Sequence, residues 1–157
     1  TGLKNRTAFE KEMNEIRTEE KEWKTEHPKE NWVVLVTDMN GLKKINDGLG
    51  HTKGDEAIIR TGSLLKQNFE GVGNCYRIGG DEFCVLSRVE RMEDFEEACS
   101  EFRAAVRKAD EQTEYQYAVS VGYCVVDESG IDECLKKADR LMYEEKSRSK
   151  KQAEDAK

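Results

Sequence analysis

The sequence has no apolar run long enough to span a membrane and no visible secretory signal. The sequence has fewer positive than negative residues: 26 Lys and Arg against 33 Asp and Glu, which gives a net charge of −7. This deficit argues against broad electrostatic binding to nucleic acid or to an anionic membrane, so we expect neither contact and a phosphate ligand must be held by local groups. The cysteines include no CxxC pair, which argues against a disulfide framework or a structural zinc site and indicates a reducing cytoplasm. They are Cys75, Cys84, Cys99, Cys124 and Cys134.

The length of 157 residues, with no internal repeat or low-complexity tract, predicts a single domain over 1–157 with a substantial core. Residues from 1 to about 28 are predicted to hold an amphipathic helix, running from Arg6 to about Lys24. Residues from about 147 to 157 are predicted to be a frayed tail. The chain begins abruptly at Thr1, so we expect it to be a piece of a longer protein, membrane-bound or not.

The alternation of apolar and polar residues predicts an α+β fold. Strands are expected at 32–36, on both sides of a hairpin at 77–83, and at 117–126; helices are expected at 42–47, 54–69, 93–109 and 131–146. Without the leading helix, this order is a βαββαβ core of the ferredoxin type, with helices packed on one face of a mainly antiparallel sheet. In such a sheet the first strand lies beside the hairpin.

The hairpin stretch Arg77–Phe83 carries two glycines followed by two carboxylates. Gly79 and Gly80 can adopt the positive φ that a two-residue turn requires, and they leave no side chain between the backbone and a ligand. Asp81 and Glu82 repel one another unless a divalent cation binds between them. A solvated acidic turn is the alternative.

Polar residues also follow the first strand abruptly. Asp38 is well placed there for chemistry, although taken alone it is better explained as a capping or turn residue. The amides of residues 41–43 open the next helix and form a ready phosphate site, to which Lys43 and Lys44 add positive charge. Asp55 could be only an N-terminal cap. Because the first strand neighbours the hairpin, Asp38 and Asp81 can meet, which is typical of a two-metal phosphoryl-transfer site.

Three stretches resemble the successive signatures of the GGDEF family, the diguanylate cyclases: TGLKNR at 1–6, DMNGLKKINDGLGHTKGD at 38–55 and RIGGDEF at 77–83. The resemblance spans nearly the whole chain and implies a fold like those of nucleotide cyclases and polymerase palms. It implies condensation of two GTP into cyclic di-GMP with release of two pyrophosphates. It also implies two Mg²⁺ or Mn²⁺ ions per active site, a transient homodimer in which each protomer holds one GTP, and an upstream sensor domain.

The resemblance assigns roles to individual positions. Asp38, Asp81, Glu82 and the Met39 carbonyl match the metal ligands, and Asp81, Glu82 and Lys43 are assigned to catalysis. Asp81 is the candidate for removing the proton of the attacking 3′-hydroxyl. The positions that match substrate contacts are Asn46 and Asp55 for guanine, and Gly41, Leu42, Lys43, Gly79, Gly80, Lys146 and Lys150 for the rest of the nucleotide.

Three departures from the family pattern stand out. Asn40-Gly41-Leu42 replaces a frequent second Asp and an aromatic residue, and Lys150 stands where an arginine is common, which keeps the charge but loses bidentate geometry. Glu70 and Gly73 stand at the Arg and Asp of the family's product-inhibition motif. We therefore predict no feedback inhibition through that site.

Two other functions are weighed against an active cyclase. A non-catalytic module would bind GTP or a protein partner as a regulatory element. A cyclase with relaxed base choice would make a mixed GMP–AMP product, against which Asp55 argues, because a carboxylate accepts two hydrogen bonds that guanine offers and adenine does not.

Overall fold

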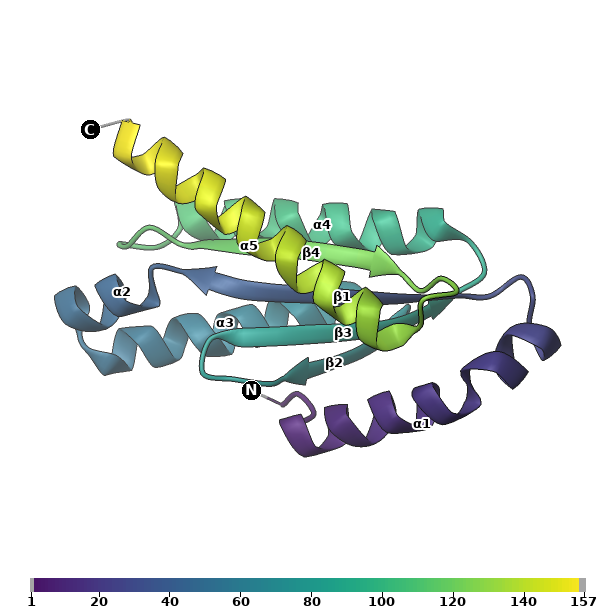
Figure 1. The fold of residues 1–157 in the computed structure, drawn as a ribbon. Coiled ribbons are helices and arrows are strands. Elements are labelled where there is room, and N and C mark those ends of the chain that lie inside the picture. The colour runs from purple at the N-terminus through teal and green to yellow at the C-terminus, as the bar shows by residue number, and fades with distance from the viewer. Residues whose placement is uncertain (1, 156–157) are drawn as a thin grey trace.

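Residues 2–155, the side chain of Ala153 excepted, are described by a computed structural model and form four strands and five helices (Figure 1). In chain order they are α1 (Arg6–Glu26), β1 (Asn31–Asn40), α2 (Leu42–Leu49), α3 (His51–Phe69), β2 (Gly73–Arg77), β3 (Glu82–Val89), α4 (Met92–Glu111), β4 (Ala118–Val125) and α5 (Ile131–Asp155). No helix among these residues is long and apolar enough to cross a membrane.

The strands form one antiparallel sheet in the order β2-β3-β1-β4. With α2 and α3 between β1 and β2, and α4 between β3 and β4, this is the predicted βαββαβ arrangement. β1 lies in the interior of the sheet because its run from Val33 to Val36 is wholly apolar and is at most 1% exposed. The predicted neighbourhood of β1 and the hairpin is therefore confirmed.

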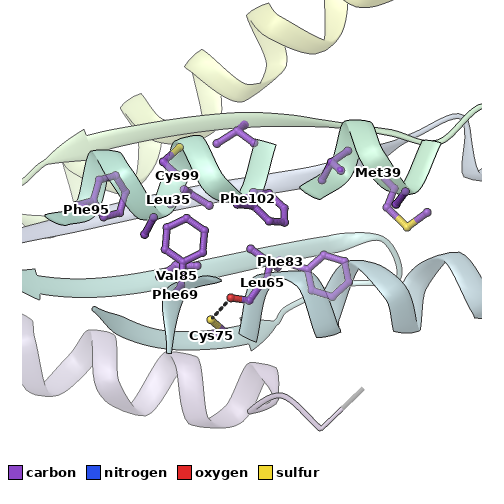
Figure 2. Close-up of a cluster of buried hydrophobic side chains, with 14 of the residues drawn as sticks. Leu35, Met39, Leu65, Phe69, Cys75, Phe83, Val85, Phe95, Cys99 and Phe102 are labelled. Atoms are coloured by element: carbon purple, nitrogen blue, oxygen red, sulfur yellow. Dashed lines mark hydrogen bonds between the residues drawn. The ribbon is translucent and has the colours of Figure 1, made fainter. Parts of the chain in front are cut away.

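Successive residues of β1 face opposite layers of the molecule. Leu35 and Met39 contribute to a core under α3 and α4 that includes the three rings Phe69, Phe95 and Phe102 (Figure 2). Val34 and Val36 contribute to a second core under α1 and α5. Helices were expected on one face of the sheet. This holds for α2, α3 and α4, which connect the strands, whereas α1 and α5 cover the other face (Figure 1).

The boundary between α2 and α3 lies at Gly50, whose φ of +90° is a conformation that favours glycine. α3 therefore begins at His51, three residues before the predicted start at Gly54. Asp55 lies in the second turn of α3 and is not its N-cap, so the capping alternative for Asp55 was wrong.

Helix α5 lies directly against β4. A Cβ atom at Gly122 would overlap the Ala138 carbonyl oxygen and the Met142 nitrogen of α5, so only glycine permits this approach. The helix continues to Asp155, whereas the sequence predicted an end near Lys146 and a frayed tail. The predicted helix end was wrong, since residues 146–155 contain no glycine or proline that would end a helix. The fraying of the tail stays a prediction, and 156–157 lie outside the described residues.

The N-terminal segment pairs with the outer edge of β2. Lys4 donates its backbone N–H to the Cys75 carbonyl over 3.3 Å and accepts from the Arg77 N–H over 2.9 Å. Asn5 then caps α1, because its side chain accepts the Ala8 N–H over 2.9 Å. Lys4 and Asn5 are thereby fixed beside the turn that follows β2.

Candidate active site

Four residues, Ile78 to Asp81, connect β2 to β3. The Ile78 and Gly79 N–H groups both donate to the Glu82 carbonyl, over 2.9 and 3.2 Å. Neither Gly79 nor Gly80 has a positive φ, so the predicted two-residue turn with left-handed glycines was wrong. The connection is instead closed by Arg77, whose guanidinium donates to the carbonyl oxygens of both glycines over 2.9–3.3 Å.

The pairing of β1 with β3 brings three carboxylates together. Asp38 lies opposite Glu82 in the register of the two strands. The Met39 N–H donates to the Asp81 carbonyl over 3.1 Å, which holds Asp81 beside β1. The Met39 side chain is 1% exposed in the core on the opposite face, so only its main chain is available to this site. The structure thus joins Asp38 to Asp81 and Glu82, which lie more than forty positions later in the sequence.

Asp38 is the most enclosed of these groups. Its Oδ2 accepts a hydrogen bond from the Lys146 ammonium over 2.9 Å, while Oδ1 is buried without a hydrogen-bond partner. Burial raises the pKa of this carboxyl, the Lys146 hydrogen bond lowers it, and the charge of Asp81 raises it further; the net direction is upward. A buried oxygen that lacks a partner costs free energy, and a cation bound there would recover it.

Glu82 also has a raised pKa. The largest cause is burial, followed by the negative charges of Asp139, Asp38 and Asp81. The sequence analysis did not single out Asp139, which α5 places beside the site. Even so, among residues 2–155 no three His, Cys, Asp or Glu side chains are grouped closely enough to hold a metal ion without other ligands.

The start of α2 lies next to the end of β1. Gly41 is its N-cap, with a φ of +73° and no side-chain cap, so the first amides of α2, those of Leu42 and Lys43, lack a side-chain partner there. A Cβ atom at Gly41 would meet nothing within 4 Å. Free amides at an open helix start are the donors that a phosphate group uses.

The two positions expected to read guanine lie in adjacent helices. Asn46 of α2 packs so closely on Gly54 of α3 that a Cβ atom at Gly54 would overlap its Oδ1. Asp55 follows Gly54 directly and is exposed. The structure therefore brings Asn46 next to Asp55.

The lysines of α5 are placed differently from one another. Lys146 reaches Asp38, whereas Lys150 lies one turn further along and is exposed. Glu145, which the sequence analysis missed, accepts the Val121 N–H of β4 with Oε2 and pairs through Oε1 with Arg103 of α4 over 2.8 Å. We call Glu145, Val121 and Arg103 the α5 brace. No periodic signal marks Glu145, because its partners are one backbone amide and an arginine 42 positions earlier.

A family model described as "Diguanylate cyclase, GGDEF domain" matches residues 1–152. The chain belongs to the GGDEF family. Among curated proteins, the "Uncharacterized membrane protein SERP0413" of Staphylococcus epidermidis is 27% identical over 94% of this chain, and the "Signaling protein YkoW" of Bacillus subtilis is 31% identical over 76% of it. The chain spans 42% of the length of SERP0413 and 16% of YkoW.

Solved GGDEF domains share this fold. The GGDEF domain of PA1120 from Pseudomonas aeruginosa matches with a TM-score of 0.78 and 25% identity, covering 94% of this chain and 92% of that one. The GGDEF domain of DgcB from Caulobacter crescentus, solved in complex with c-di-GMP, matches with a TM-score of 0.77 and 23% identity over 94% and 87% of the two chains. The fold is thus the α+β fold of GGDEF domains, as predicted.

Two neighbouring cavities of this GGDEF domain lie away from Asp38, between α1 and the β2–β3 edge. One, of about 340 Å³, is lined by Glu70 and Gly73, the two positions of the expected product-inhibition motif, together with Glu12 and Arg88. The Arg88 guanidinium lies over the Trp23 ring at 4.2 Å and 3.7 Å from Glu30. A Cβ atom at Gly73 would lie 2.6 Å from the Leu86 carbonyl oxygen, so this position has no room for an aspartate side chain.

Proposed function

We propose that this domain is a diguanylate cyclase that condenses two GTP into cyclic di-GMP and two pyrophosphates. The observation that carries the proposal is the buried, unpartnered Oδ1 of Asp38, beside Asp81 and next to the uncapped start of α2. Family membership supports the reaction class, and the retained Asp38, Asn46, Asp55 and Asp81 support activity in this particular chain.

The residues present fit divalent cations of the Mg²⁺ type. Carboxylate and carbonyl oxygens are the ligands that Mg²⁺ prefers, and Mg²⁺ commonly takes one or two carboxylates and completes its shell with substrate phosphates and water. This habit accounts for a site in which no three acidic side chains form a cage. Asp38, Asp81 and the Met39 carbonyl are the proposed ligands, with Glu82 as a further one.

Bound metal would lower the pKa of the attacking 3′-hydroxyl and neutralise charge on the α-phosphate and the leaving pyrophosphate. The chain's own groups orient the substrate. The amides of Leu42 and Lys43 bind phosphate oxygens, the turn at Gly79 and Gly80 leaves room above the backbone, and the side chains of Asn46 and Asp55 bind guanine. Asp81 accepts the proton of the 3′-hydroxyl, while Lys43, Lys146 and Lys150 supply positive charge.

Each protomer holds one GTP, so the reaction requires two protomers face to face around a two-fold axis. An upstream sensor domain would raise their effective concentration. The chain spans less than half of the curated relatives it matches, and one of these is named a membrane protein, which supports a longer, membrane-anchored parent. We propose that this domain of it lies in the cytoplasm.

One observation favours a second function. Lys146 lies on Asp38, and Lys150 replaces the usual arginine, so nucleotide binding without efficient turnover is the alternative. Such a domain would act as a GTP-binding or partner-binding regulatory module.

The deciding experiment measures product from GTP and Mg²⁺ over a range of protein concentrations. Cyclic di-GMP should rise more steeply than linearly with protein, because two protomers must meet. Asp81→Ala should lower the rate by about 100-fold or more, through loss of a metal ligand and base. Asp94→Ala, which removes an exposed carboxylate from α4, should keep the rate. GTP binding without product in the unmodified domain would favour the regulatory module instead.

A further inference from the structure

The Lys146 ammonium neutralises the carboxylate that is proposed to bind metal. Its Nζ lies 2.9 Å from Asp38 Oδ2, and the two side chains are 35% and 16% exposed, so the pair is partly withdrawn from water. A hydrogen bond between two charged groups is stronger than one between neutral groups. A divalent cation approaching Asp38 therefore meets a carboxylate that already has a positively charged partner.

The main chain of Lys146 is fixed while its ammonium remains free to move. The α5 brace ties the preceding residue, Glu145, to both β4 and α4, and Gly122 lets α5 lie directly on β4. Beyond this anchor the lysine side chain is a flexible stem of four methylenes. Lys146 can thus leave Asp38 for another anion nearby without movement of the helix.

The Lys146 ammonium donates to only one of the two carboxylate oxygens of Asp38, Oδ2, and the buried Oδ1 has no hydrogen-bond partner. The Lys146 ammonium carries a single positive charge, so it cannot neutralise both Asp38 and the neighbouring Asp81, whereas a divalent cation can. The free site is therefore neutralised enough to be stable and still has unmet capacity for a cation.

We propose that Lys146 is a tethered competitor for divalent metal at Asp38, and that the nucleotide triphosphate relieves the competition by drawing the ammonium onto its phosphates. Metal and nucleotide then bind with positive coupling, and each raises the affinity for the other by the same factor. Without nucleotide, the domain binds metal weakly. This inference rests on the proposed function for the identity of the nucleotide, but its central claim concerns nucleotide-free protein.

The test is Mn²⁺ binding to nucleotide-free protein, measured from the electron paramagnetic resonance signal of free Mn²⁺. Lys146→Met keeps the length of the side chain and removes the charge, and it should bind Mn²⁺ about 10-fold more tightly or better, the factor that corresponds to about 1.4 kcal/mol. Lys151→Met removes the same charge from an exposed position of α5 and should bind like the unmodified domain. Adding Asp38→Asn to Lys146→Met should abolish the gain.

Equal Mn²⁺ affinity in Lys146→Met and Lys151→Met, including no detectable binding by either, would overturn the inference. Lys146→Gln serves as a second charge-free variant if Lys146→Met misfolds by circular dichroism. Failure of the proposed function gives a different result. If the domain makes no cyclic di-GMP but Lys146→Met binds Mn²⁺ more tightly, the competition by Lys146 stands and the cyclase proposal fails. If the domain makes cyclic di-GMP but Lys146→Met binds Mn²⁺ no more tightly, the cyclase proposal stands and the competition fails.

The role of the brace has its own test. Glu145→Gln weakens the link to Arg103 and loosens the position of Lys146, so it should give a smaller gain in Mn²⁺ affinity. Asp132→Asn is the matched control, because Asp132 also pairs α5 with an arginine of another helix, Arg17, over 2.7 and 2.8 Å, and lies far along α5 from Lys146. Unchanged Mn²⁺ affinity in Glu145→Gln would show that the brace does not position the lysine.

Discussion

Glu82 shows at the residue scale what the candidate site costs the fold. Its carboxylate is half-buried beside three other acidic side chains, and burial and these charges raise its pKa above the ordinary value of 4.5. The folded chain therefore holds this proton to a higher pH than the unfolded chain does. Stability must then fall as pH rises from about 4.5 through the raised pKa of the folded state.

Glu82→Gln should accordingly stabilise the domain at pH 7 while weakening metal-dependent activity. The expected gain is of the order of 1 kcal/mol, or about 2–4 °C in Tm. Thermal unfolding at a series of pH values checks it, because the gain should vanish as pH falls through the raised pKa and the unmodified glutamate becomes neutral. A gain that is constant with pH would assign the effect to packing rather than to charge.

Residue types along the chain predicted which groups the site contains, but not how they are paired. The abrupt polar residues after the β1 run and the carboxylates after the glycines pointed to Asp38 and Asp81, and strand order brought the two together. The pairing of Lys146 with Asp38 was not predicted, because an ammonium and a distant carboxylate leave no periodic signal. The backbone of Gly79 and Gly80 was mispredicted, since the Arg77 guanidinium closes that turn in place of left-handed glycines.

At the scale of elements, α5 connects the fold to the site. It packs on β4 through Gly122 and delivers Lys146 to Asp38. The existence of this helix was predicted from the stripe of apolar residues at helical spacing. Its length was not predicted, because the serines and lysines from Ser147 onward are as compatible with a helix as with a polar tail.

Gly122→Ala should separate α5 from β4, because the added methyl group would overlap backbone atoms that cannot turn aside as a flexible side chain can. We expect a loss of about 2–3 kcal/mol in the free energy of unfolding. Urea denaturation measures this loss. The control is Gly71→Ala, where a Cβ atom meets nothing within 4 Å and φ is not positive, and it should be nearly neutral. Equal stability of the two variants would contradict the close approach seen here.

At the scale of the whole molecule, the net charge of −7 means that the proposed phosphate binding depends on the local amides and lysines of one end of the sheet. The opposite region, between α1 and the β2–β3 edge, is acidic. Its cavity places Glu12 and Glu70 near each other, and its arginine, Arg88, is already held by Trp23 and Glu30. An anionic cyclic dinucleotide would meet repulsion there.

Cyclic di-GMP should therefore not saturate this surface. The chain has two tryptophans, Trp23 and Trp32, and both line the cavities in question, so intrinsic fluorescence reports directly on this region. We expect no saturable fluorescence change on titration, and no loss of initial rate caused by binding there. The DgcB GGDEF domain, solved in complex with c-di-GMP, serves as the positive binding control. A saturable signal that Glu70→Ala alters would contradict the prediction.

The two outer strands of the sheet have consequences for how copies of the domain can meet. The Lys4 main chain forms hydrogen bonds with the main chain of β2, and Glu145 accepts the Val121 N–H of β4. Hydrogen-bonding positions on both edge strands are therefore already engaged within the chain. Exposed edge strands are where sheets of separate molecules pair and aggregate. Because these positions are engaged, edge-to-edge pairing of two copies is disfavoured, and contact through side chains is favoured. Such contacts form and separate readily, which suits the proposed reaction, in which protomers would come together and part at every turnover.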